Sequence, residues 1–113
     1  MDFKTMIQND NILQWLQNWY QSQCDGEWEH EYGVKIDTAD NPGWSIHINL
    51  EYTELEELIY GTPVIENSED DWYFIKVENS IFYAAGDPTK LELLLWKFRE
   101  LVEAQQRLEA NRE

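Results

Sequence analysis

Carboxylates and aromatic rings alternate in one short segment of the chain, EWEHEYG at residues 27–33. Glutamates occupy every second position, and Trp28, His30 and Tyr32 fill the positions between them. The three glutamates are Glu27, Glu29 and Glu31. A period of two is typical of a half-buried β-strand, so we expect a strand over residues 28–36 with the carboxylates about 6–7 Å apart on its outer face. Such a row presents hydrogen-bond acceptors to arginine or lysine side chains of a partner.

Acidic residues also gather around this predicted strand and before a second tryptophan, Trp72. Rings beside carboxylates are typical of interfaces with basic proteins, because the ring supplies buried area and the carboxylate accepts hydrogen bonds from arginine or lysine. Trp28 and Trp72 both adjoin acidic groups, and for each ring a place in the core is an equal alternative. The predicted partner-binding residues are Glu27, Trp28, Glu29, Glu31, Asp37, Asp40, Glu69, Asp70, Asp71 and Trp72.

The sequence gives weaker indications of a catalytic or metal-binding site than of a partner-binding surface. The alternation places His30 and His47 on opposite strand faces, and the chain has no HExxH motif and a single cysteine, Cys24. We therefore predict no metal site and expect His30 at the edge of the core with a hydrogen-bond partner. Cys24 cannot form an intrachain disulfide, lacks a Cys-His-Asn signature and is expected to be structural. We predict no catalytic or cofactor-binding residue, although a small enzyme that uses paired carboxylates stays an alternative.

The chain is strongly acidic, with 23 acidic and 8 basic residues and a net charge of −15 over 113 residues. Residues 1–89 hold 18 of the acids and three lysines, whereas the charges of residues 90–113 sum to zero. Such a surface repels nucleic acids and anionic lipids and attracts basic proteins, so we expect no nucleic-acid or membrane partner. Simple solubility is the alternative explanation of the charge. Without a visible signal peptide or membrane-spanning run, a cytoplasmic protein is expected, and its oligomeric state stays open.

Hydrophobic periodicity predicts a single α+β domain over residues 1–113. Apolar residues three and four apart indicate a helix over residues 10–23 and a Leu-rich helix from the turn at residues 86–88 to about residue 106 or beyond. Period-two segments predict strands at residues 28–36, 44–51, 60–66, 72–78 and 81–85. Strands joined by short turns pair antiparallel, so we expect an antiparallel sheet of about five strands with N-terminal and C-terminal helices packed on one face. The tail over about residues 107–113 is expected to fray.

Three segments resemble the immunity protein 53 family. They are WLQNWYQSQCDGEWEHEYGVKIDTADNPGW (15–44), EDDWYFIKVEN (69–79) and the Gly-Asp-Pro turn that leads into a Leu-rich helix. The resemblance spans about residues 11–103, and its most specific parts are WEHEYG (28–33) and DNPGW (40–44). The positions that match the family pattern are Trp28, Glu29, His30, Tyr32, Gly33, Asp40, Asn41, Pro42, Gly43, Trp44, Asp71 and Trp72. Gly33 and Pro42 suit the scaffold better than a contact.

The resemblance implies a small protein that protects bacteria from a polymorphic toxin, with a cognate toxin domain as its partner. A toxin that attacks nucleic acid carries a basic cleft, and an acidic protein can occupy that cleft by charge complementarity alone. We therefore expect the protein to cover a basic active-site or substrate-binding surface with an acidic face. The alternative from another class is an acidic adaptor domain that binds some other basic protein.

Overall fold

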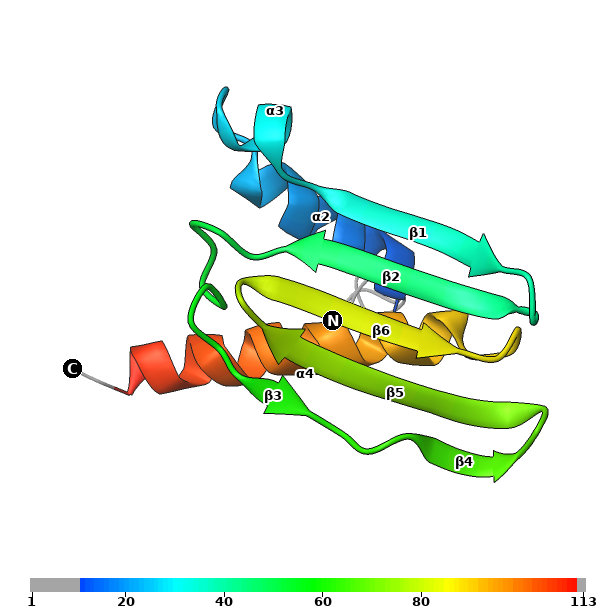
Figure 1. Cartoon of the computed structure of the whole chain (residues 1–113). Coiled ribbons are helices and arrows are strands. Elements are labelled where there is room, and N and C mark those ends of the chain that lie inside the picture. Colours follow the sequence, from blue (N-terminus) through cyan, green and yellow to red (C-terminus); the bar gives the residue numbers. More distant parts are fainter. Residues whose placement is uncertain (1–10, 112–113) are drawn as a thin grey trace, which may run out of the picture.

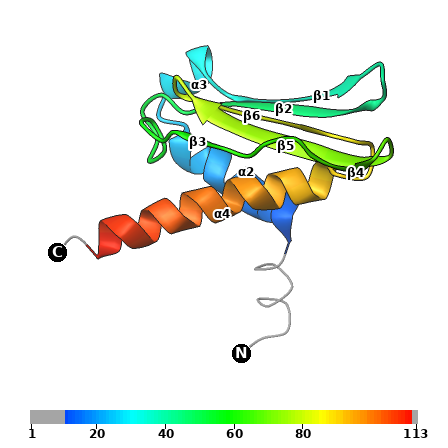
Figure 2. The same ribbon diagram turned by 60° about the horizontal axis from the view of Figure 1, so that its bottom comes forward.

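A computed structural model describes residues 11–111 of the chain. Its helices are α2 (Ile12–Gln23), α3 (Trp28–Glu31) and α4 (Leu91–Ala110). Its strands are β1 (Val34–Ala39), β2 (Gly43–Asn49), β3 (Tyr60–Gly61), β4 (Ile65–Ser68), β5 (Asp71–Glu78) and β6 (Ile81–Gly86). The strands form one antiparallel sheet in the order β1-β2-β6-β5-β3, and β4 also pairs with β5 (Figure 1). Helices α2 and α4 lie on one face of the sheet (Figure 2), so the predicted α+β fold is confirmed.

The core lies between this sheet face and the two long helices. Cross-strand register aligns Ile46 with Ala84 and Ala84 with Ile75, and all three side chains are buried. From the helix side, Phe98 is fully buried and its ring meets Phe82 at a centroid distance of 5.0 Å. These residues follow the periods of two and 3.6 that predict the strands and helices, because only one face of each element is buried.

The two long helices begin differently. Asn11 caps α2, since its Oδ1 accepts a 3.0 Å hydrogen bond from the Gln14 N–H. Asn9 and Asp10 are also residue types that cap helices, but they lie outside the described residues. Helix α4 starts at Leu91, after the predicted turn, and continues to residue 110. The expected fraying of the tail over residues 107–113 stays a prediction.

The segment around α3 is where the sequence-based expectation is wrong. Residues 28–31 form one helical turn, and the strand begins only at Val34. The Asp25 carboxylate accepts the N–H groups of Glu27 and Trp28 at 2.9 Å each, and the Glu29 carboxylate accepts the N–H groups of Asp25 and Gly26. These local hydrogen bonds satisfy the start of a helical turn and override the alternating pattern. Glu27, Glu29 and Glu31 therefore do not form a row on a strand.

The far edge of the sheet also differs from expectation. The predicted strand at residues 60–66 is divided into β3 and β4, and both pair with β5. Pro63 lies between them and cannot donate to a strand ladder, which explains the interruption. Thr62 still joins the two pieces to β5, because its N–H donates to the Ile75 carbonyl at 2.9 Å and its Oγ1 accepts from the Ile75 N–H at 3.1 Å.

Two turn segments connect strands of the sheet. Asn79 and Ser80 form the tight β5–β6 turn with φ values of 54° and 61°, the left-handed region that a two-residue hairpin turn requires. Residues 51–57 make a series of turns, in which the Glu56 N–H donates to the Thr53 carbonyl at 3.2 Å. No helix within residues 11–111 is long and apolar enough to cross a membrane.

Candidate partner-binding surfaces at the two ends of the sheet

The antiparallel topology sends the connecting segments to two opposite ends of the sheet (Figure 1). One end, here the α3 end, comprises residues 25–32 and 51–58, which adjoin the Val34–Ile48 pair of β1 and β2. The other, here the β4–β5 end, comprises residues 37–43, 66–72 and 86–90. The acidic surface is thus divided between two ends and does not form one strand face.

The predicted contact residues divide accordingly. Those at the α3 end are Glu27, Trp28, Glu29 and Glu31. Those at the β4–β5 end are Asp37, Asp40, Glu69, Asp70, Asp71 and Trp72. The structure therefore brings together two groups of predicted residues but keeps the groups apart, so a single contact patch that includes all ten residues is not present.

Ion pairing distinguishes the two ends. At the β4–β5 end, the Lys90 ammonium lies 2.7 Å from carboxylate oxygens of both Asp71 and Asp87. The α3 end carries eight carboxylates: Asp25, Glu27, Glu29, Glu31, Glu51, Glu54, Glu56 and Glu57. None of these eight forms a salt bridge with any residue in the part of the chain that the structure describes. At the β4–β5 end, five carboxylates likewise form no salt bridge within residues 11–111: Asp37, Asp40, Glu66, Glu69 and Asp70. Carboxylates without a salt bridge therefore occur at both ends and are more numerous at the α3 end.

Two of the predicted contacts at the α3 end are scaffold residues. Trp28 is 4% exposed, its indole Nε1–H donates to the Glu51 carbonyl at 2.8 Å, and its ring meets Trp19 at 6.2 Å. The Glu29 carboxylate is turned back onto its own loop, where backbone N–H groups of Glu29, Asp25 and Gly26 lower its pKa. Trp28 thus belongs to the core, and Glu29 fixes the turn before α3.

Carboxylates and rings line a pocket of about 570 Å³ at this end, here the α3 groove. Its lining residues are Asp25, Gly26, Glu27, Trp28, His30, Glu31, Tyr32 and Tyr52. The Tyr32 and Tyr52 rings lie 6.1 Å apart, and burial, followed by the charge of Glu31, raises the pKa of Tyr32. His30 is exposed here, so its predicted position at the edge of the core is wrong.

Tyr52 is the functional candidate that sequence reasoning missed. Its side chain is 78% exposed, and its backbone has a φ of 64°, in the region that a tyrosine rarely adopts. The Glu56 carboxylate accepts the Tyr52 N–H at 2.9 Å and helps to hold this conformation. No pattern in the sequence signals a left-handed tyrosine, so only the structure places this ring beside the α3 groove.

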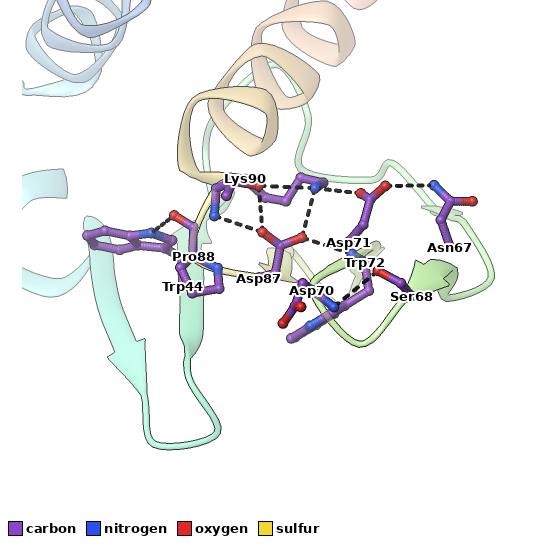
Figure 3. A network of polar contacts seen from close by, with 10 residues as sticks. Trp44, Asn67, Ser68, Asp70, Asp71, Trp72, Asp87, Pro88 and Lys90 are labelled. Atoms are coloured by element: carbon purple, nitrogen blue, oxygen red, sulfur yellow. Dashed lines mark hydrogen bonds and ion pairs between the residues drawn. The ribbon is translucent and has the colours of Figure 1, made fainter.

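The β4–β5 end is organised around a buried carboxylate, Asp87 (Figure 3). Its Oδ2 accepts from the Trp72 N–H at 2.8 Å and from the Lys90 ammonium at 2.7 Å, and its Oδ1 accepts from the Thr89 N–H and hydroxyl. Burial alone would raise the pKa of Asp87, but the hydrogen bonds from Lys90, Thr89 and Trp72 outweigh it and hold that pKa well below its usual range. The network ties the start of β5 to the start of α4. Asp71 belongs to it through Lys90, which makes Asp71 a scaffold residue.

A second pocket, of about 670 Å³ and here the β4–β5 groove, lies beside this network. It brings the DNPG turn next to the acidic turn, since Asn41 and Pro42 line it together with Glu69, Asp70 and Trp72. Asp37 and Asp40 do not line it.

Gly43 explains why the turn beside this groove ends in glycine. A Cβ atom at Gly43 would lie 2.5 Å from the carbonyl oxygen of Gly86 and 3.5 Å from the Trp72 ring. The first distance leaves no room for a Cβ atom, whereas the second is an ordinary van der Waals contact, so the close approach of β2 to β6 requires this glycine.

The residues considered for metal binding or nucleophilic chemistry are dispersed. Within residues 11–111, no group of three or more His, Cys, Asp or Glu side chains is placed to hold a metal ion. His47 lies on the outer sheet face beside the Tyr83 ring, at a centroid distance of 4.5 Å. The exposed His30 instead lines the α3 groove. The Cys24 thiol donates to the Tyr20 carbonyl at 3.3 Å. These contacts are structural.

Comparison with known proteins gives one result. Residues 13–103 match the family model of immunity protein 53, whereas no curated protein and no solved structure matches the chain significantly. The match covers most of the 113 residues and includes both ends of the sheet. The chain therefore belongs to the immunity protein 53 family.

Proposed function

We propose that this protein binds a cognate bacterial toxin in the cytoplasm and neutralises it, with the α3 end as the principal contact surface. Membership of an immunity protein family supports the kind of partner. The observation that carries the choice of surface is that eight carboxylates at the α3 end lack a salt bridge within residues 11–111, against five at the β4–β5 end. Four of the eight, Asp25, Glu29, Glu54 and Glu56, accept hydrogen bonds within the protein. Glu27 and Glu31 are exposed and form no salt bridge within residues 11–111, so they are available to the cations of a partner.

Charge complementarity defines the proposed partner as basic. An acidic surface steers a basic protein into an encounter and aligns it, and exposed carboxylates at the rim act mainly on the association rate. Glu27 and Glu31 are exposed and line the α3 groove, where a bound partner would desolvate them. Once desolvated, charge pairs of this kind also slow dissociation, in addition to the effect of these carboxylates on the association rate. The proposed mechanism is occupancy of a basic active-site or substrate-binding surface, and it needs no chemical step from the immunity protein.

The test takes as candidate toxin the C-terminal segment of the large open reading frame adjacent to the gene for this protein. Both proteins are produced together, and cell survival, co-purification and the dissociation constant are measured. We expect protection of the cells and a complex whose affinity falls about tenfold or more, equivalent to about 1.4 kcal/mol, when Glu27→Gln and Glu31→Gln are combined. Toxicity that persists although the immunity protein is folded and abundant would refute the function. A complex that forms without protecting the cells would instead indicate an adaptor.

A matched variant at the other end controls for net charge. Glu69→Gln combined with Asp70→Asn also removes two exposed negative charges, and both residues line the β4–β5 groove. We expect this variant to bind the toxin within about threefold of the parent, because long-range attraction between exposed charges is weak and screened. If the two double variants lose affinity equally, net charge and not the α3 end determines binding.

A further inference from the structure

We propose that the α3 groove receives an arginine side chain of the partner, between aromatic rings and beside two carboxylates. That the partner is a toxin rests on the function proposed above; the capture of a guanidinium group rests on the groove itself. A partner that binds here must therefore place an exposed arginine opposite the α3 groove.

The aromatic side chains of the groove belong to a longer series of neighbouring rings. Tyr20, Trp28, Tyr32 and Tyr52 follow one another with 6.1 Å between each pair of neighbouring ring centroids. Trp28, Tyr32 and Tyr52 line the groove, and the hydrogen bond from the Trp28 indole to the Glu51 carbonyl fixes the orientation of its ring. Ring faces attract cations, and guanidinium groups are found over them more often than ammonium groups.

The carboxylates of the groove differ in how far they are already engaged. The Asp25 carboxylate accepts two backbone N–H groups, so it is used by the loop. Among the described residues, the Glu27 carboxylate takes part in no hydrogen bond or salt bridge, and Glu31 forms no salt bridge. Glu51 does not line the groove, but one of its carboxylate oxygens is buried without a hydrogen-bond partner from residues 11–111, and its charge acts on Tyr32. The site therefore has a negative field that no neighbouring cation within these residues compensates by contact.

Arginine fits this combination better than lysine. Its planar guanidinium can stack on a ring while its N–H groups donate to carboxylates at the edge, whereas an ammonium is a compact and strongly hydrated charge. The groove is a surface feature, since Tyr52 is 78% exposed and Glu27 and Glu31 are also exposed. It can therefore receive a side chain that projects from a folded partner.

The isolated immunity protein allows a test without any toxin. Chemical shifts are followed by NMR during titration with N-acetyl-arginine amide, with the lysine amide, and with the amide of citrulline, a neutral isostere of arginine. We expect saturable shifts confined to residues 25–32, Tyr52 and the indole N–H of Trp28, with an apparent affinity about tenfold lower for the lysine amide and no saturable shift with citrulline. Equal effects of the arginine and lysine amides, an equal effect of citrulline, or shifts outside the groove would overturn the proposal.

Two variants connect the shifts to the groove. Tyr52→Asn removes the ring but tolerates the left-handed backbone, and Glu27→Gln with Glu31→Gln removes the charges. Each should abolish saturation while the rest of the spectrum stays unchanged, and Tyr52→Phe should retain it. Saturation that persists in both variants would refute the assignment.

The outcomes separate this inference from the proposed function. If arginine amide saturates the groove but the protein fails to protect cells, the groove inference stands and the toxin-neutralising function fails. If the protein protects cells but no saturable arginine shift is found, the function stands and this inference fails.

Discussion

Replacement of Trp28 by phenylalanine tests whether this tryptophan is a core residue or a partner contact. The change removes the indole N–H that donates to the Glu51 carbonyl at 2.8 Å, at a position only 4% exposed. A buried carbonyl that loses its partner costs about 1–3 kcal/mol, and the smaller ring leaves a cavity worth about 1 kcal/mol more. The expected loss in the free energy of unfolding is therefore about 2–4 kcal/mol. A domain of 113 residues has about 6–17 kcal/mol in total, so the variant stays folded.

Urea unfolding followed by circular dichroism measures this loss, and Trp72→Phe is the matched control. Trp72 is half-buried, and its indole N–H donates to no residue in the described part of the chain. The same chemical change there should lower the free energy of unfolding by less than about 1 kcal/mol. Toxin affinity of the folded Trp28→Phe protein should stay within about threefold of the parent, because a ring still lines the α3 groove. Unchanged stability with lost binding would refute the reasoning and make Trp28 a direct contact.

Three further predictions follow from the sheet ends. Gly43→Ala should lower the free energy of unfolding by about 1–3 kcal/mol, because the new Cβ atom meets the Gly86 carbonyl. In Gly33→Ala the new Cβ atom points into open space, so the free energy of unfolding should change by less than about 0.5 kcal/mol. Thermal unfolding of the two variants makes the comparison. The Asp87 pKa is lower in the folded than in the unfolded state, so the stability that Asp87 contributes is present above about pH 4 and is lost as the pH falls below it. Asp87→Asn should therefore be less stable at neutral pH and lose less stability between about pH 4 and pH 2 than the parent, as measured by urea unfolding at each pH. Finally, raising the salt concentration should slow association of the toxin with the parent more than with the Glu27→Gln, Glu31→Gln variant, measured by stopped-flow mixing; equal slowing would exclude these carboxylates from steering.

The strongly periodic elements could be predicted from the sequence. Helix α2, strands β2, β5 and β6, and the turn at residues 79–80 occur where their hydrophobic periods and turn residues indicate. Each of them packs one face against a single core, so the order of apolar and polar residues along it predicts which face is buried. The same pattern of apolar residues predicts helix α4, which is 20 residues long.

The segment around α3 could not be predicted, because period two and a single helical turn are indistinguishable over so few residues. The deciding contacts are the carboxylates of Asp25 and Glu29 on neighbouring backbone N–H groups and the indole of Trp28 on a carbonyl 23 residues away. Composition shows that carboxylates are abundant but not which of them turn inward.

The candidate surfaces were predictable in residue type but not in placement. The sequence indicates Glu27 and Glu31 as contact residues. The position of Tyr52, which lines the same groove, depends on a left-handed backbone conformation that no sequence pattern indicates. Asp87 lies in the turn before α4, and only the fold shows that Trp72 and Asp71 of β5 join its network.

Hydrogen bonding within α3 has a consequence for how the partner surface can diversify. The turn is held by short-range bonds within residues 25–32 and by the anchored Trp28, and no strand ladder runs through residues 27–31. Its amide protons should exchange by local opening, independently of global unfolding. Glu27 and Glu31 can then change over generations without weakening the sheet, so new recognition specificity can arise on an unaltered framework.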